Sequence, residues 1–179
     1  DCKFILNKNA IKEITQLWND QTENVAGIGF IPQNYNLPKV TFLQKLLNIN
    51  SNKIGKVLKS GNVSAWHKKT TITNVEWLHG GCVTWNLKYC KDLFKRNYTI
   101  IEWSVAEDLL YSFRKQKKFP IKITNKIKIK YIQSISSLNI KSSFKRGFLH
   151  AKIIKNFVKH EKELSLFLYY YSMIFSSIL

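Results

Sequence analysis

Residues 24–32, NVAGIGFIP, form a largely apolar, uncharged segment that contains two glycines and ends at Pro32. A short apolar run that a proline terminates predicts a buried β-strand. Upstream of it, Ala10, Ile14 and Leu17 recur at the spacing of one helix face, which predicts a helix. Strands and helices are therefore expected to share one core, as in the α/β class.

Strand and helix patterns continue along the rest of the chain. The segment KVTFLQKLLNI, residues 39–49, predicts a short helix, and residues 105–118 predict a longer one. Isoleucines recur at period two over residues 121–129, on either side of Thr124-Asn125, which is typical of strands. From residue 144 to the end the pattern is helical. Because neither an internal repeat nor a Gly/Ser/Pro linker interrupts these segments, one mixed domain is the simplest prediction.

Composition limits the class of protein. The chain has 179 residues, of which 45% are hydrophobic and 13% aromatic, so it is not a disordered polybasic tail. Its formal net charge is +18, which favours an anionic partner such as nucleic acid, an anionic membrane surface or a phosphorylated ligand. The excess is mostly lysine in a chain also rich in Ile and Asn. A biased genome would give the same pattern, so the charge carries little weight on function.

The cysteines indicate the redox compartment of the protein, and the first residue bears on whether the sequence is a fragment. Cys2, Cys82 and Cys90 are odd in number and none is in C-x-x-C spacing. This pattern disfavours a disulfide framework or a zinc ribbon and fits a reducing cytosol. The sequence starts at Asp1 rather than Met and has no signal-peptide pattern. We expect it to be a fragment with residues missing upstream.

Two neighbouring acids, Glu107 and Asp108, open the predicted helix at 105–118. Ser104 and Glu107 match the capping box S-x-x-E, which explains Glu107 without any chemistry. Acids in a first helical turn are also favoured by the helix dipole. The alternative is that Asp108 is a catalytic base. The local pattern favours the cap, because a catalytic carboxylate also needs a cleft and a partner.

The segment VEWLHGGCVTW, residues 75–85, places Trp77 and His79 before two glycines. Consecutive glycines let a backbone approach a ligand closely, and a tryptophan ring can stack on a sugar or a base. The simpler alternative is a tight turn beside a core tryptophan. His79 and Cys82 as metal ligands lack a second pair at suitable spacing.

The order of these two segments resembles the C-terminal half of the catalytic domain in glycosyltransferase family 2, the inverting GT-A-type enzymes. In that family a W-x-x-G-G stretch precedes an E-D-x-x-x-S-x-R stretch. The upstream segment GKVLKSGN, residues 55–62, is also similar to such enzymes. The resemblance covers roughly residues 1–135. Residues 136–179 then form a basic amphipathic and apolar helical tail, similar to the membrane-leaning end of many members.

The resemblance implies a partial GT-A domain, with a mixed sheet flanked by helices and followed by C-terminal helices. It implies inverting transfer of a hexosyl-type sugar from a nucleotide-sugar donor to an acceptor hydroxyl, in polysaccharide or surface-glycan synthesis. Family members place the base at the second acid of the pair, Asp108, while Glu107 caps the helix and helps to orient the acceptor. The substrate-binding residues implied are Trp77, His79, Gly80 and Gly81, which form the wall where the two sugars meet, and Arg114. Arg114 either faces the diphosphate or is an ordinary solvated or core-bridging arginine.

The family also implies a divalent metal, Mg or Mn, held by a run of aspartates. Asp1 fits the last acid of that run, and the nucleotide-binding half upstream is then missing, so the fragment could be inactive alone. Many members carry a histidine after the strand that follows the E-D helix. The corresponding KIKIKYIQ has none, and His150 and His160 lie too far along the chain to replace it.

The partners implied are a nucleotide-sugar donor, a glycan or lipid-linked acceptor and no specific nucleic acid. We expect a cytoplasmic protein, peripheral on the inner face of the cell membrane through its tail. The last segment, 164–179, has 16 residues, fewer than the ~20 of a membrane span. It is an interfacial helix, a docking helix or a span cut short.

Two alternatives involve no catalysis. One is a basic nucleic-acid-binding module, although the lysines are dispersed and no zinc-finger or RNP-like motif occurs. The other is a membrane-surface module built on the basic, amphipathic residues 143–163. A half-domain would expose a sheet edge, so marginal stability is expected.

Overall fold

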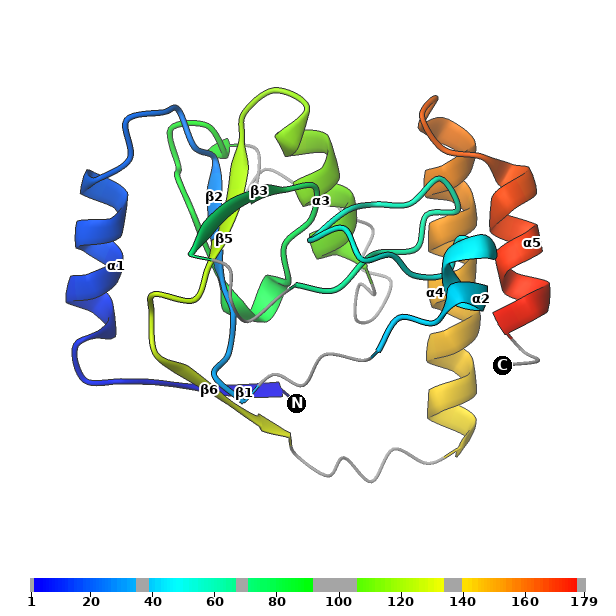
Figure 1. The fold of residues 1–179 in the computed structure, drawn as a ribbon, viewed down its shortest axis with the longest axis horizontal. Helices are drawn as coiled ribbons and strands as arrows, with labels where there is room; N and C mark the ends of the chain where they lie inside the picture. The colour runs from blue at the N-terminus through cyan, green and yellow to red at the C-terminus, as the bar shows by residue number, and fades with distance from the viewer. Residues whose placement is uncertain (1, 35–38, 67–70, 92–105, 134–139, 177–179) are drawn as a thin grey trace.

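The computed structural model of the chain describes residues 2–34, 39–66, 71–91, 106–133 and 140–176. Figure 1 shows its strands and helices. In chain order they are β1 (Cys2–Leu6), α1 (Ala10–Asn19), β2 (Gly27–Phe30), α2 (Phe42–Leu46), β3 (Ile72–Val75), a 3-10 turn η1 (Gly80–Cys82), β4 (Val83–Trp85), α3 (Glu107–Gln116), β5 (Ile121–Thr124), β6 (Ile129–Gln133), α4 (Ile140–His160) and α5 (Leu166–Ser176).

The main sheet has four strands in the order β3-β5-β2-β4. Strands β2 and β5 are parallel, whereas β4 and β3 pair antiparallel with them at the two edges. Helix α1 lies on one side of this sheet and α3 on the other, with α4 and α5 beyond α3 (Figure 1). The expected mixed α/β fold, a mixed sheet flanked by helices, is therefore confirmed.

The glycines of β2 allow two layers to approach the same strand. Ile28 and Phe30 are buried in a cluster with the apolar residues of α1. Gly27 and Gly29 face the other way, where side chains fill the space: a Cβ on Gly27 would lie 2.6 Å from the Trp85 ring and 3.1 Å from Leu78 Cδ1, and one on Gly29 would lie 2.8 Å from Leu78 Cδ2. The segment after β3 can therefore lie directly against the sheet.

The strands predicted from the isoleucine pattern are present, but they belong to different sheets. Strand β5 pairs with β2 and β3, while β6 pairs antiparallel with β1 in a separate two-stranded sheet. The turn at Asn125 thus carries the chain from one sheet to the other rather than closing a hairpin. Ile127, in this connection, is buried with α1.

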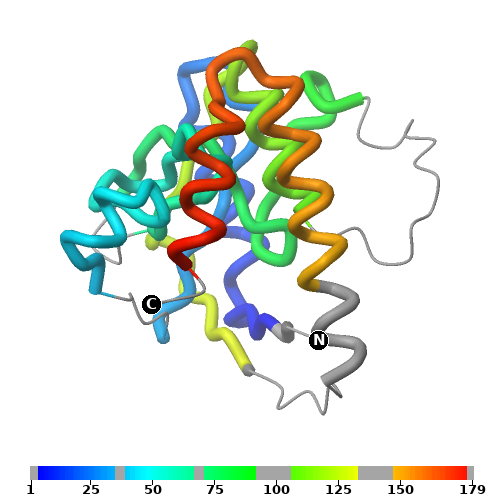
Figure 2. Tube along the Cα trace, turned by 90° about the vertical axis from the view of Figure 1, so that its right-hand side faces the viewer, coloured from blue at the N-terminus to red at the C-terminus, as the bar shows by residue number. Residues whose placement is uncertain are grey.

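The helical tail packs against α3. Leu109 and Phe113 of α3 form a buried cluster with Phe157 of α4 and Tyr169 of α5. Figure 2 shows α4 and α5 side by side on this side of the molecule. Among the described helices, none is both long and apolar enough to cross a bilayer. The boundary predicted at residue 135 falls outside the described part of the chain.

The start of α3 differs from the prediction. The helix begins at Glu107, and its N-cap is Ala106 with φ 70° rather than Ser104. The predicted hydrogen bonds between Ser104 and Glu107 fall outside the described residues. The left-handed Ala106 turns the chain there, so the helix starts two residues later than the S-x-x-E pattern indicates. Glu107 is then the first helical residue rather than the third. Ser104, like Asp1, lies outside the described residues.

Candidate active site

The two predicted segments meet at Gly80 and Asp108. The backbone N–H of Gly80 donates to Asp108 Oδ2 at 2.8 Å, and the N–H of Leu109 donates to Asp108 Oδ1 at 2.9 Å. A Cβ on Gly80 would lie 3.2 Å from the Asp108 Cβ. Hydrogen bonds to an ionised acceptor are stronger than neutral ones, so the turn and the start of α3 hold the carboxylate in one place.

Ser112 also joins the turn segment to the start of α3. Its hydroxyl accepts a hydrogen bond from the Leu78 N–H at 3.1 Å and donates to the carbonyl oxygen of Asp108. The residue is fully buried. Ser112 lies one helical turn after Asp108, so the E-D-x-x-x-S spacing carries a contact to the W-x-x-G-G segment. The E-D-x-x-x-S-x-R pattern includes this serine, but no role was predicted for it from the sequence.

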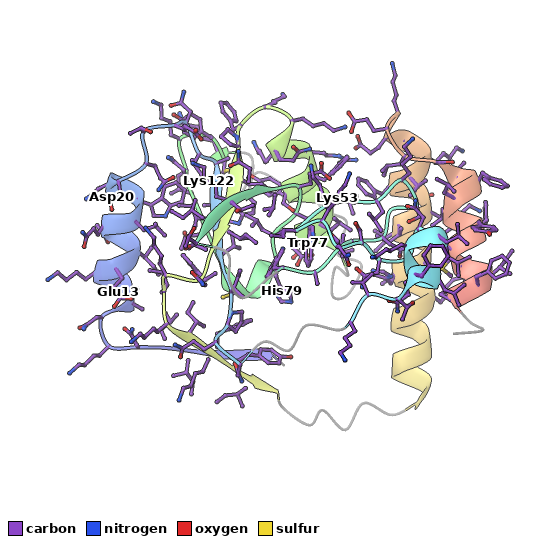
Figure 3. All side chains as sticks on the ribbon, viewed as in Figure 1. Glu13, Asp20, Lys53, Trp77, His79 and Lys122 are labelled. Carbon is purple, nitrogen blue, oxygen red and sulfur yellow. The ribbon has the colours of Figure 1, made fainter. Side chains whose placement is uncertain are left out.

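Trp77 is held firmly at the edge of the site. Its ring stacks on Trp66 with 4.7 Å between centroids and 27° between planes. Its indole N–H donates to the carbonyl oxygen of Ser64 at 3.0 Å. Trp77 is therefore half-buried and anchored at both its face and its nitrogen. Figure 3 shows it near His79 at the centre of the molecule.

His79 turns one ring edge toward an aromatic cavity. Its Nδ1 accepts from the Gly81 N–H at 3.2 Å, which assigns the proton of the neutral ring to Nε2. The ring meets Phe4 and Trp66 edge to face, at centroid distances of 6.1 and 6.4 Å. The cavity has a volume of about 160 Å³ and is lined by Phe4, Pro32, Trp66, His79, Cys82 and Tyr131.

Most of this lining was missed from the sequence. Phe4 and Tyr131 face each other across the β1–β6 pair, with ring centroids 5.5 Å apart. They are 127 positions apart (131 − 4), and neither lies in a recognisable local pattern. Trp66 stands alone after the GKVLKSGN segment. Its stacking on Trp77 could be suspected only from the shared aromatic character.

Cys82 lines the cavity as a neutral thiol. Burial raises its pKa from 9.0 to about 11, although a hydrogen bond with the Phe30 backbone acts in the opposite direction. A protonated thiol is a poor metal ligand. Within the described ranges, no group of three or more His, Cys, Asp or Glu side chains could hold a metal ion. Asp1, the residue expected to hold Mg or Mn, lies outside the described residues, so the metal stays a prediction and no step is derived through it.

His150 is closer to the site than the sequence indicates. Desolvation lowers the pKa of its imidazole, and the nearby Asp108 carboxylate acts to raise it. The charge of Asp108 therefore acts on a residue of α4, 42 positions away (150 − 108). Sequence reasoning had set His150 aside as too distant.

Two other predicted site residues, Arg114 and Glu107, do not line the cavity. Arg114 lies in the last turn of α3, where its Nε is 3.1 Å from Glu161 Oε1. Its side chain is 58% exposed, in keeping with the ordinary solvated arginine that was the alternative. Glu107 is exposed beside Asp108 in the first turn of α3.

Comparison of the chain with protein-family models, with curated proteins and with solved structures finds no match. The site therefore has to be interpreted from its own geometry. Its centre is a carboxylate fixed by backbone N–H groups beside an aromatic cavity.

Proposed function

We propose that this chain is catalytic, transferring a sugar from a nucleotide-sugar donor to an acceptor hydroxyl with inversion. The 2.8 Å hydrogen bond from Gly80 to Asp108 carries the proposal, because it joins the two segments on which the family resemblance rests. A partial GT-A domain is the finer fold assignment that goes with it. The acceptor class is a glycan or a lipid-linked glycan.

Asp108 acts as the base. Each of its carboxylate oxygens accepts one backbone hydrogen bond, and each keeps a further lone pair for an acceptor hydroxyl. The carboxylate takes the hydroxyl proton as the acceptor oxygen bonds to the anomeric carbon. The bond from that carbon to the diphosphate oxygen breaks with its electron pair, and the nucleoside diphosphate leaves. Attack opposite the leaving group inverts the configuration.

The aromatic cavity supports one part of the substrate. Its volume of about 160 Å³ is below the roughly 300–1,000 Å³ of typical small-molecule sites. A whole nucleotide sugar does not fit such a space, whereas a single ring does. The faces of Phe4 and Tyr131 offer apolar contact to the C–H face of a sugar.

Replacement of Asp108 tests the proposal. Asp108→Asn keeps the shape and one acceptor oxygen but removes the base. We expect nucleoside diphosphate release, assayed over a panel of UDP-, GDP- and dTDP-sugars with glycan acceptors, to fall by about 10²–10⁴-fold. The far-UV circular dichroism spectrum should be unchanged.

Asp20→Asn is the matched control, because Asp20 is an exposed acid at the end of α1. Figure 3 labels it on α1 at the left edge of the molecule, away from Trp77 and His79 at the centre. This variant should keep wild-type release. Near-normal turnover in Asp108→Asn would remove Asp108 as the base. Failure of the wild-type protein to bind or turn over any donor in the panel would overturn the proposed function.

A further inference from the structure

Helix α5 presents an apolar face to solvent. Tyr169 and Ser172 are buried against the rest of the protein, whereas Phe167, Tyr170 and Ile174 are 74%, 46% and 61% exposed. The spacing of the exposed residues, i, i+3 and i+7, puts them on one side of the helix. A surface helix normally carries polar residues there, yet residues 164–179 contain no charged side chain.

Helix α2 adds to this apolar surface. Phe42, Leu43 and Leu46 are 76%, 50% and 62% exposed. The amide of Asn62 donates to the carbonyl oxygen of Asn48, just after α2, and to the hydroxyl of Ser172 in α5. The two helices are thus tied to one loop, and Figure 2 shows both on the same side of the molecule. We call their exposed apolar residues the α2–α5 face.

Lysines border the α2–α5 face. Lys155 Nζ lies 5.5 Å from the centre of the Tyr170 ring. Lys152 and Lys159 are exposed at helical spacing from it along α4. Residues 24–75 and 109–160 contain no Asp or Glu at all. Helices α2 and α4 therefore carry lysines and no acid beside the exposed apolar residues of α2 and α5.

We propose that the α2–α5 face docks on a bilayer surface that carries anionic lipid. Aromatic and aliphatic side chains enter the boundary of headgroups and acyl chains, while neighbouring lysines meet lipid phosphates. Helix α5, with 11 residues, lies along the surface rather than across it. A symmetric dimer through this face would bring the lysines of the two copies together at a cost in repulsion. The proposal goes beyond glycosyl transfer and does not depend on it.

Vesicle binding by the full chain tests the apolar part. Phosphatidylcholine vesicles with and without phosphatidylglycerol are sedimented with wild-type protein, Phe167→Ser and Ile11→Ser. Ile11 is the matched control: it is 70% exposed on α1, at the opposite end of the molecule (Figure 1). We expect binding to the phosphatidylglycerol vesicles, weakened about tenfold or more in Phe167→Ser and unchanged in Ile11→Ser.

A second pair of variants tests the lysines and does not disturb the core. Lys152→Gln/Lys155→Gln should weaken binding by roughly tenfold or more, while Lys8→Gln/Lys12→Gln should have a much smaller effect. Wild-type protein that ignores anionic vesicles, or equal losses in variants and controls, would overturn the proposal. A third result would also overturn it: the wild-type protein is a dimer in sedimentation equilibrium, Phe167→Ser dissociates this dimer, and the wild-type protein does not bind vesicles. A second copy of the chain would then cover the face.

Discussion

The backbone nitrogen of Gly80 and the Oδ2 atom of Asp108 are 2.8 Å apart, although the two residues are 28 positions apart in the sequence. This contact leaves almost no room at Gly80, where an added Cβ would lie 3.2 Å from the Asp108 Cβ. Either the turn or the carboxylate must shift by a few tenths of an ångström to admit a methyl group.

Gly80→Ala should therefore displace Asp108. We expect a loss of about 1 kcal/mol in the free energy of unfolding and a clear loss of transferase activity. Gly147→Ala is the control, because nothing lies within 4 Å of that Cβ position in α4. In a helix this change should stabilise by about 0.5–1 kcal/mol. Urea unfolding measures both, and equal effects of the two variants would contradict the steric argument.

The pKa of His150 should report the charge of Asp108. Desolvation holds this pKa below 6.5, and the Asp108 carboxylate partly opposes that shift. Asp108→Asn removes this negative charge while desolvation remains, so the pKa of His150 should fall further. Titration of the imidazole C–H signals by NMR measures the change. A pKa that rises in Asp108→Asn would show that the two groups do not interact as the structure indicates.

Trp77→Phe should destabilise the protein by about 1–2 kcal/mol. The phenyl ring can still stack on Trp66, but the carbonyl of fully buried Ser64 loses the indole N–H that it accepts from. A buried acceptor without a donor costs about 1–3 kcal/mol. Urea denaturation gives the difference in free energy, and an unchanged midpoint would contradict it.

The ion pairs between α3 and the end of α4 should make stability depend on pH. Burial acts to raise the pKa of Glu161, but hydrogen bonds and charges from Lys117 and Arg114 outweigh it and bring the pKa below 4.5. A carboxyl with a lowered pKa in the folded state stabilises above its unfolded pKa, and this contribution is lost as the pH falls.

Glu161→Gln should therefore cost about 1 kcal/mol at pH 7, and the difference from wild type should shrink below pH 4.5. Glu163→Gln is the control: Glu163 also meets Lys117, at 3.2 Å, but its side chain is 62% exposed against 13% for Glu161. Its effect should be near zero. Urea unfolding across pH measures both, and a pH-independent cost of Glu161→Gln would refute the linkage.

Cys82 should resist alkylation in the folded protein. It is 5% exposed, and burial raises its pKa to about 11, so little thiolate forms at pH 8. Iodoacetamide labelling followed by peptide mass spectrometry should find Cys82 unmodified in buffer and modified in urea. Rapid labelling in buffer would contradict the burial.

Local patterns predicted the elements better than their assembly. The helix around Ala10 and Leu17 and the strand at Gly27–Phe30 follow from spacing within single segments, and both are present. The partner of β6 does not follow from spacing. Register between Phe4 and Tyr131 depends on contacts distant in sequence, which a local pattern does not contain.

In the candidate site, too, local features were predictable from the sequence and long-range contacts were not. The resemblance implied that Gly80 and Asp108 belong to one site, but their hydrogen bond was not predicted, because no spacing rule joins a turn to a helix 28 positions later. The N-cap was predicted incorrectly because Ser104 fits the motif, while the left-handed Ala106 determines where the helix starts. The Asp108 charge acts on His150 because α4 packs on α3, a tertiary relationship that no local sequence pattern contains.

The pairing of β2 with β5 limits how early the main sheet can fold during synthesis. Residues 27–30 form the first of these strands and residues 121–124 the second, so the centre of the sheet closes a loop of about ninety residues. Such closure is slow because its entropy cost precedes the contacts that offset it. On the ribosome, β2 can pair with β4 on one edge, but its other edge stays unpaired until β5 has left the exit tunnel. During synthesis it is thus the segment for which a chaperone would compete.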